Sequence, residues 1–286
     1  MEDFKCYLCG CTEYTERAKK TRDNPLVRPL ECRNCGLVML SSFAHINSDY
    51  YTDSHMHDTK KWDIQIEMAQ GEADDSRRYE FMKDLARNKN ILDIGCGAGG
   101  FLLKVKKIAK AVAGVEPEAR LQSHFQQQGL SVRFDINEIP PDFPDIITMF
   151  HVLEHLPDPI NFLKTLREKF FSIIPRGVVI EVPSASDALI TLYDNAKFKD
   201  FTYWSCHLFL FTEETLKSVA EKAGFQVVEM VQVQRYPLSN HLYWLAKGEP
   251  GGQHIWNFFN KFNASMAYEE ILKEQKICDT ILAVLK

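Results

Sequence analysis

The 286-residue sequence has no apolar run that approaches the length of a membrane span, and its acidic start, Met1-Glu2-Asp3, leads to no apolar segment. We therefore expect no membrane-spanning helix and no signal peptide, and a cytoplasmic location is the resulting expectation. A basic excess is also lacking: 34 Lys and Arg face 39 Asp and Glu, which argues against a nucleic-acid partner. Internal repeats are absent, so the sequence predicts one large domain or one medium domain with appendages.

Cysteine, by contrast, is concentrated at one end, with five of the eight cysteines in the first 35 residues. Two pairs share one spacing, Cys6-x-x-Cys9 and Cys32-x-x-Cys35, and each pair is followed by glycine. Two such turns offer tetrahedral sulfur ligation to Zn²⁺, so residues 1–45 are predicted to be a zinc ribbon. A disulfide framework and a redox pair are the alternatives. A cytoplasmic chain disfavours the first, and two matched pairs disfavour the second.

The segment 91–102 is the most informative part of the chain. Apolar residues lead into Asp93, four glycines follow within six positions, and an amphipathic run comes next. This order predicts a buried strand, a tight turn and a helix start, which is the nucleotide-binding corner of a doubly wound sheet. Gly95, Gly97 and Gly100 also fit G-x-G-x-x-G, so a dinucleotide and S-adenosylmethionine (SAM) are both candidate ligands. Asp93 favours SAM, because a carboxylate repels a pyrophosphate and attracts the cationic methionine end of SAM.

Strands and helices alternate from about residue 90, which predicts a mostly parallel, doubly wound α/β sheet covered on both faces. Helices are expected to begin near Gly99, Pro117, Pro159 and Thr212. Two later strands are expected to form an antiparallel closing hairpin. The predicted strands are 90–94, 111–115, 130–134, 145–150 and 177–182, then 225–233 and 241–246 in the hairpin.

The flanking segments are predicted from the same patterns. Residues 46–87 are expected to be a connector with helices, in which Gly71 breaks a helical run over 60–88. The polar, histidine-bearing part of the connector, 49–58, is expected to be a solvated or substrate-facing loop. Residues 247–286 are expected to be a helical tail. Its amphipathic helix would carry Ile271, Ile277, Ile281 and Leu285 on the apolar face.

The pattern D-x-G-x-G-x-G, with an acidic residue ending the next strand, resembles class I SAM-dependent methyltransferases over residues 88–246. The resemblance implies a Rossmann-like fold and SAM as the methyl donor. It implies that Glu116 holds both ribose hydroxyls and that the segment 135–138 meets the adenine edge. The predicted cofactor-binding residues are Asp93, Gly95, Cys96, Gly97, Glu116, Asn137, Glu138 and His151.

A second segment, 150–159, resembles the x-L-E-H-x-x-D-P segment of small-molecule methyltransferases, including ubiquinone-pathway O-methyltransferases. Glu154 and His155 in it are interpreted as structural, bridging strand to helix, with direct catalysis as the alternative. The cysteine ribbon joined to this domain resembles methyltransferases of sugar and surface-polysaccharide biosynthesis. Their catalytic segment is roughly Y-x-E-H-x-x-Y-F, and residues 204–211 keep its histidine as His207 but not its tyrosine or glutamate.

The sequence therefore predicts methyl transfer from SAM to a small polar acceptor, a hydroxyl of a sugar or sugar nucleotide in polysaccharide biosynthesis. Because the segment of the carbon methyltransferases is altered, transfer to oxygen is favoured, with His207 as the base and His151 as the reserve candidate. An RNA methyltransferase with a zinc ribbon is one alternative, disfavoured because residues 1–60 hold eight Lys and Arg against nine Asp and Glu. A SAM-binding interaction module without catalysis is the other.

Overall fold

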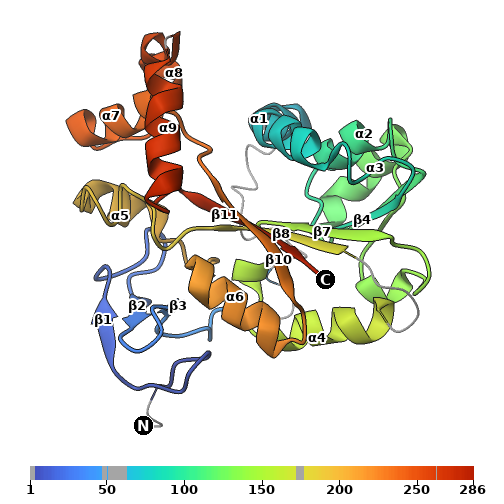
Figure 1. Cartoon of the computed structure of the whole chain (residues 1–286), viewed down its shortest axis with the longest axis horizontal. Coiled ribbons are helices and arrows are strands. Elements are labelled where there is room, and N and C mark those ends of the chain that lie inside the picture. Colours follow the sequence, from blue (N-terminus) through green and yellow to red (C-terminus); the bar gives the residue numbers. More distant parts are fainter. Residues whose placement is uncertain (1–3, 47–49, 51–62, 172–176, 262) are drawn as a thin grey trace.

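The computed structural model describes residues 4–46, 50, 63–171, 177–261 and 263–286. Its centre is a seven-stranded sheet with helices on both faces (Figure 1). The strand order is β10-β11-β8-β7-β4-β5-β6, in which β8, β7, β4, β5 and β6 pair in parallel and β11 runs antiparallel to β8 and β10. The predicted doubly wound, mostly parallel α/β fold is confirmed. The strands are β4 (Asn90–Ile94), β5 (Ala111–Val115), β6 (Val132–Arg133), β7 (Ile146–Phe150), β8 (Gly177–Pro183), β10 (Val227–Val233) and β11 (Thr280–Leu285).

The helices lie in two layers. Leu163 of α4 and Leu216 of α6 are buried against one face of the sheet, and Met82 of α1 and Phe101 of α2 against the other. The helices α7 to α9 form an arm inserted between β10 and β11, which extends away from the sheet (Figure 1). The helices are α1 (Ile64–Met82), α2 (Gly100–Val105), α3 (Gln122–Gln128), α4 (Pro159–Phe170), α5 (Ala196–Thr202), α6 (Glu213–Lys222), α7 (Leu238–Lys247), α8 (Gly252–Ile255) and α9 (Ala264–Glu274), with short 3₁₀ turns η1 (Ala119–Leu121), η2 (Ile136–Glu138), η3 (Leu153–His155) and η4 (Asn257–Lys261).

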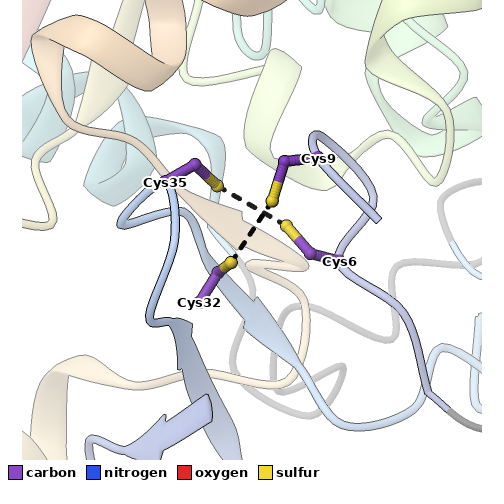
Figure 2. A group of neighbouring side chains, drawn as sticks. All are labelled: Cys6, Cys9, Cys32 and Cys35. Atoms are coloured by element: carbon purple, nitrogen blue, oxygen red, sulfur yellow. Dashed lines mark hydrogen bonds between the residues drawn. The ribbon is translucent and has the colours of Figure 1, made fainter. Parts of the chain in front are cut away.

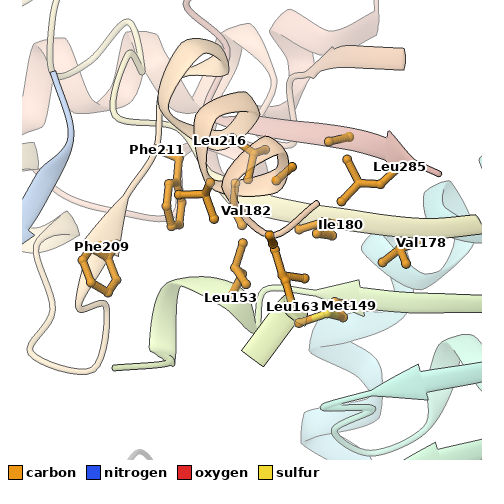
Figure 3. Close-up of a cluster of buried hydrophobic side chains, with 14 of the residues drawn as sticks. Met149, Leu153, Leu163, Val178, Ile180, Val182, Phe209, Phe211, Leu216 and Leu285 are labelled. Carbon is orange, nitrogen blue, oxygen red and sulfur yellow. The ribbon is translucent and has the colours of Figure 1, made fainter. Parts of the chain in front are cut away.

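The central strands are mostly apolar because both faces of the sheet are covered, and Asp93 in β4 and Glu181 in β8 are buried charged exceptions. Val178, Ile180 and Val182 of β8 are each completely buried. Figure 3 shows these side chains between α6 and the segments β7 and η3. A parallel strand with helices on both sides needs apolar residues at successive positions, which is the pattern that located these strands in the sequence.

The N-terminal region adds a second, small sheet of order β1-β2-β3-β9. Its fourth strand, β9 (Phe209–Leu210), comes from the loop after β8 and pairs with β3. Leu37 and Leu40 are buried in the same apolar cluster as the central sheet, so the two parts share one core. The first three strands are β1 (Tyr14–Glu16), β2 (Pro29–Cys32) and β3 (Val38–Leu40).

The end of the chain differs from the prediction. Residues 241–246, predicted as a strand, lie in α7, which starts after Pro237 and ends at Gly248 in the left-handed conformation. His241 and Trp244 are buried at helical spacing in α7. The second strand of the hairpin is β11 instead, so the predicted helix through Ile281 and Leu285 is wrong there. Within the predicted tail, α8, η4 and α9 are helical, and β11 fills the position between β8 and β10.

The helix before the sheet also differs, because α1 runs through Gly71 without a break. A glycine inside a helix costs only about 1 kcal/mol relative to alanine, which tertiary contacts can offset. Here α1 packs closely on the start of α2, where a Cβ on Gly100 would lie 2.0 Å from Oδ2 of Asp75. The predicted loop 49–58 lies outside the described residues apart from Tyr50. Among the helices that the structure describes, none is long and apolar enough to span a bilayer.

Candidate functional site

A cavity of about 390 Å³ opens at the carboxyl ends of β4, β5 and β7, where open α/β sheets bind ligands. Its volume lies within the roughly 300–1,000 Å³ of small-molecule sites. The wall combines the glycine turn after β4, the end of β5, the segment around η2, and η3. The residues in it are Glu67, Ile94, Gly95, Gly97, Val115, Glu116, Pro117, Glu118, Arg120, Leu121, Phe134, Asp135, Ile136, His151, Val152, His155, Leu156 and Phe162.

The glycine turn gives the cavity its floor. Gly95 has φ of +66°, and a Cβ there would lie 2.5 Å from a methyl carbon of Val152. Gly97 has φ of +50° and would meet nothing within 4 Å, so its backbone borders open space. A side chain at residue 95 would collide with Val152. A side chain at residue 97 would strain the backbone and project into the cavity.

Glu116 lies beside this turn at the end of β5. Its Oε2 accepts a hydrogen bond from the Gly97 N–H at 2.8 Å, and its Oε1 accepts one from the Glu118 N–H at 3.0 Å. Burial raises the pKa of the Glu116 carboxyl, although these two hydrogen bonds act in the opposite direction. The side chain is thus fixed against the cavity, and each carboxylate oxygen keeps a lone pair for a ligand hydroxyl. This arrangement fits the ribose of SAM.

Two other predicted cofactor residues lie beneath the turn, outside the cavity wall. Asp93 is 3% exposed and accepts a hydrogen bond of 2.6 Å from the Thr148 hydroxyl, and burial raises its pKa to about 7. The sulfur of Cys96 lies 2.7 Å from where a Cβ on Gly114 would be, and burial raises the pKa of the thiol. Asp93 thus contacts β7 and Cys96 lies against β5, and neither side chain lines the cavity.

Asn137 and Glu138 lie in η2, also outside the wall. Glu138 Oε1 accepts hydrogen bonds from the N–H groups of Phe134 and Asp135, at 3.2 and 3.1 Å. The Asn137 N–H in turn donates to Asp135 Oδ1 at 2.7 Å. This is a capping box, and its D-x-x-E spacing is visible in the sequence. The cavity side of the segment is therefore formed by Phe134, Asp135 and Ile136, of which the last two belong to the predicted segment 135–138, and not by Asn137 and Glu138.

His151 follows β7 and lies in the wall, with φ of +58°. Its Nδ1 lies 3.1 Å from Glu154 Oε1, and its Nε2 lies 3.3 Å from Glu181 Oε1. Burial and Arg235 would lower the pKa of His151, but the hydrogen bonds to the two carboxylates outweigh them, and the pKa is raised. Both carboxylates are fully buried, and Arg235 Nη1 also lies 3.3 Å from Nε2, so the ring is enclosed by charged groups of both signs.

Glu181 is the centre of an ion network that ties α1 to the sheet. Arg77 donates to both of its oxygens at 2.7 and 3.0 Å, and Arg78 donates two hydrogen bonds to Oε1 at 3.0 and 2.8 Å. Despite burial, the charges of His151, Arg78 and Arg77 hold the pKa of Glu181 well below its usual range. Arg235 adds a second pair with Asp74 of α1. No local sequence pattern predicted this network, because its members come from α1, β8 and the loop after β10.

His207, the predicted base, is not in the cavity wall. Its ring lies edge-on to His155, with 5.0 Å between ring centroids, and His155 is the one that lines the cavity. Burial, and secondly the neighbouring His155, lower the pKa of His207 to about 3. His155 Nδ1 lies 2.8 Å from the carbonyl oxygen of Cys206, which fixes the loop carrying His207 to η3.

The four ribbon cysteines converge on one point (Figure 2). The Cys6 and Cys35 sulfurs are 3.6 Å apart, and those of Cys9 and Cys32 are 3.5 Å apart. A zinc ion with four Zn–S bonds of about 2.3 Å sets its ligands about 3.8 Å apart. The donor set and its spacing therefore fit a tetrahedral zinc site, and Cys11 is not part of the group.

The chain is similar to known methyltransferases. The family described as a methyltransferase domain matches residues 66–230, more than half of the chain. The ubiquinone biosynthesis O-methyltransferase of Pseudomonas syringae pv. tomato is 29% identical over 175 residues, which cover 54% of this chain and 71% of that protein. That of Coxiella burnetii is 27% identical over 180 residues, covering 54% and 70%. Magnesium protoporphyrin IX methyltransferase from Synechocystis PCC 6803, with bound SAH, aligns with a TM-score of 0.49 at 11% identity, covering 83% of this chain and 96% of that one.

The chain therefore belongs to the methyltransferase domain family, and it is a SAM-dependent methyltransferase of class I. This confirms the prediction of the enzyme class and of its methyl donor. It also decides between the two ligands that the glycine pattern left open, because the family match favours SAM over a dinucleotide.

Proposed function

We propose that this enzyme transfers the methyl group of SAM to a hydroxyl of a small polar acceptor, with a sugar or sugar nucleotide as the first class to test. The observation that carries the proposal is the cavity itself. At one end Gly97 and Glu116 form a cradle for the nucleoside, and at the other the wall is formed by histidines of the segment 151–155.

Different residues of the cavity are assigned to binding SAM and to the transfer step. Glu116 accepts hydrogen bonds from the ribose hydroxyls, and the backbone of Gly95 and Gly97 leaves room for the methionine part. Phe134 and Ile136 supply apolar surface for the adenine. When bound, SAM supplies an electrophilic methyl group on a sulfonium. The enzyme then has to align the acceptor oxygen with that methyl and accept the proton of the hydroxyl.

Two observations support oxygen as the methylated atom. The similar curated proteins are O-methyltransferases of ubiquinone biosynthesis. The segment around His207 also lacks the tyrosine and glutamate of the carbon methyltransferases that the sequence resembles. The relatives make phenolic hydroxyls the competing acceptor class. His207 and His151 remain predictions as bases for this step.

We further propose that Cys6, Cys9, Cys32 and Cys35 hold one structural Zn²⁺. Residues 1–45 would then form a ribbon that the metal folds and that supports the acceptor side of the cavity through the pairing of β3 with β9. In this proposed domain organisation, residues 46–87 connect the ribbon to the methyltransferase domain.

The test is a methyl-transfer assay with isotopically labelled SAM against a panel of sugars, sugar nucleotides, catechols and RNA, read by mass spectrometry. Methylation of a sugar hydroxyl is the expected result. A phenolic product would keep O-methylation and replace the sugar, and a methylated RNA would overturn the proposal. Binding of SAM without turnover on any acceptor would favour the interaction module.

A further inference from the structure

Three histidines surround one buried carboxylate beside the cavity. Glu154 in η3 is completely buried, and His151, His155 and His207 all lie close enough for its charge and theirs to interact. Burial would raise the pKa of Glu154, but the hydrogen bond with His151 and the charges of the histidines hold it at about 2. A charged carboxylate at this place stabilises whichever imidazole takes up a proton, so the arrangement is suited to a general base.

His151 is poorly placed for that role, because a base must offer the acceptor a nitrogen that can take up a proton. Its Nδ1 lies 3.1 Å from buried Glu154, and a hydrogen bond there needs the proton on Nδ1. Its Nε2 lies 3.3 Å from both Glu181 Oε1 and Arg235 Nη1, and the positive guanidinium disfavours a further positive charge on the ring. His207 is poorly placed for a different reason, because His155 and not His207 borders the cavity.

His155 meets both conditions. It lies in the cavity wall, three residues after Val152, which packs on Gly95 of the cofactor turn. Its Nδ1 lies 2.8 Å from the carbonyl oxygen of Cys206. Because a carbonyl can only accept, that nitrogen carries the proton, and Nε2 is the basic atom of the neutral ring. Nε2 is 3.9 Å from Glu154 Oε1, so a proton gained there is stabilised by the carboxylate.

We propose that His155 is the general base of the methyl transfer, and that Glu154 and the Cys206 carbonyl position it. This inference rests on the proposed hydroxyl acceptor. The hydroxyl proton moves to Nε2 while the oxygen forms a bond to the methyl carbon. The carbon–sulfur bond breaks with its electrons going to sulfur, so the positive charge of the sulfonium ends on the imidazolium of His155.

The groups that face His155 predict the pH dependence. Burial, and to a smaller extent the charge of His151, lower the pKa of His155, whereas Glu154 and the Cys206 carbonyl raise it, and the net shift is downward. The ring of His207 covers another side. Neutral His155 is the active form, so kcat is expected to rise with pH and to level off before or near the ordinary imidazole value of about 6.5.

The experiment compares His155→Gln with His207→Gln, and with His254→Gln in the exposed part of α8 as the matched control. Glutamine can still donate to the Cys206 carbonyl, so the loop keeps its anchor. The substitution of His155 is expected to lower kcat at least about a hundredfold, with the Kd for SAM within twofold and the acidic limb of the pH profile lost. The His207→Gln variant should lower kcat less than about tenfold, and the His254→Gln control should keep the wild-type kcat.

A second measurement does not depend on the acceptor. Long-range ¹H–¹⁵N spectra of the imidazoles, with His155 assigned by its loss in the Gln variant, should show the neutral Nδ1–H tautomer at pH 7. An Nε2–H tautomer or a cation there would overturn the proposal. So would an equally active His155→Gln enzyme. A wild type inactive on every hydroxyl would count against the proposed function itself.

Metal content supplies one more outcome. The ligand atoms of His155, Cys206 and His207 lie within 4.8 Å of one another, so the group is close enough to be tested for a metal ion. We expect one zinc per chain, and we expect it to be absent when a ribbon cysteine is replaced by serine. A second ion that disappears in Cys206→Ser would make His155 a ligand and overturn its role as the base.

Discussion

Replacing Glu181 by Gln tests whether the buried ion network holds α1 on the sheet. The side chain is completely buried and accepts four hydrogen bonds from Arg77 and Arg78. Glutamine keeps the shape, but it removes the charge and turns one acceptor into an amide donor that faces a guanidinium. Arg77 and Arg78 would then lack the negative charge that balances theirs, and His151 would lose one of the two carboxylates beside its ring.

The expected cost follows from the exposure of the partners. Breaking a buried ion pair from one side costs about 3–5 kcal/mol. The side chains of Arg77 and Arg78 are 28% and 13% exposed and can regain some water, so we expect the lower end, about 3 kcal/mol. At about 2–4 °C per kcal/mol for a domain of this size, the Tm should fall by roughly 6–12 °C.

Thermal unfolding at pH 7 with Glu229→Gln as the control measures this cost, because Glu229 is exposed on β10. The pKa of Glu181 is lowered in the folded state, so its stabilisation is fully present above the unfolded value of about 4.3 and is lost as the pH falls toward the folded pKa. The difference between wild type and variant should therefore shrink below about pH 4. A Tm equal to that of the control at pH 7 would refute the reasoning.

Three further outcomes are expected. Glu116→Ala should weaken SAM binding by about 1–3 kcal/mol in calorimetry, because ribose hydroxyls lose their acceptor, and stabilisation of the wild type by NAD instead of SAM would contradict the site. Gly95→Ala should abolish measurable SAM binding and lower the Tm, since its Cβ would lie 2.5 Å from Val152 at a positive φ; an unchanged Kd would show that the turn can adjust. Metal analysis of a reduced sample should give one zinc per chain, absent in Cys9→Ser, and hydrogen exchange should show residues 1–45 and β9 losing protection on chelation; a zinc-free wild type would exclude the ribbon.

The sequence predicted the central strands well because their signal is local. Residues 90–94 and 111–115 are short apolar runs bounded by turn residues, and they coincide with β4 and β5. The end of the chain could not be predicted in the same way. Ile277, Ile281 and Leu285 are spaced as on a helix, yet 280–285 forms β11 because its partners β8 and β10 leave a position open between them. The pairing of β11 with β8 joins residues about a hundred positions apart in the sequence, and that with β10 about fifty, so no local pattern predicts it.

The site shows the same division between local and long-range information. The glycine turn and Glu116 follow directly from spacing within 91–116. The histidines do not, since three of them have similar local settings and differ only in what folding places around each ring. Glu181 belongs to β8 and Cys206 to a later loop, yet Glu181 helps to enclose Nε2 of His151 and the Cys206 carbonyl fixes the proton on Nδ1 of His155. The protonation state of a histidine is set by its partners in space, so the choice of base among the three had to wait for the fold.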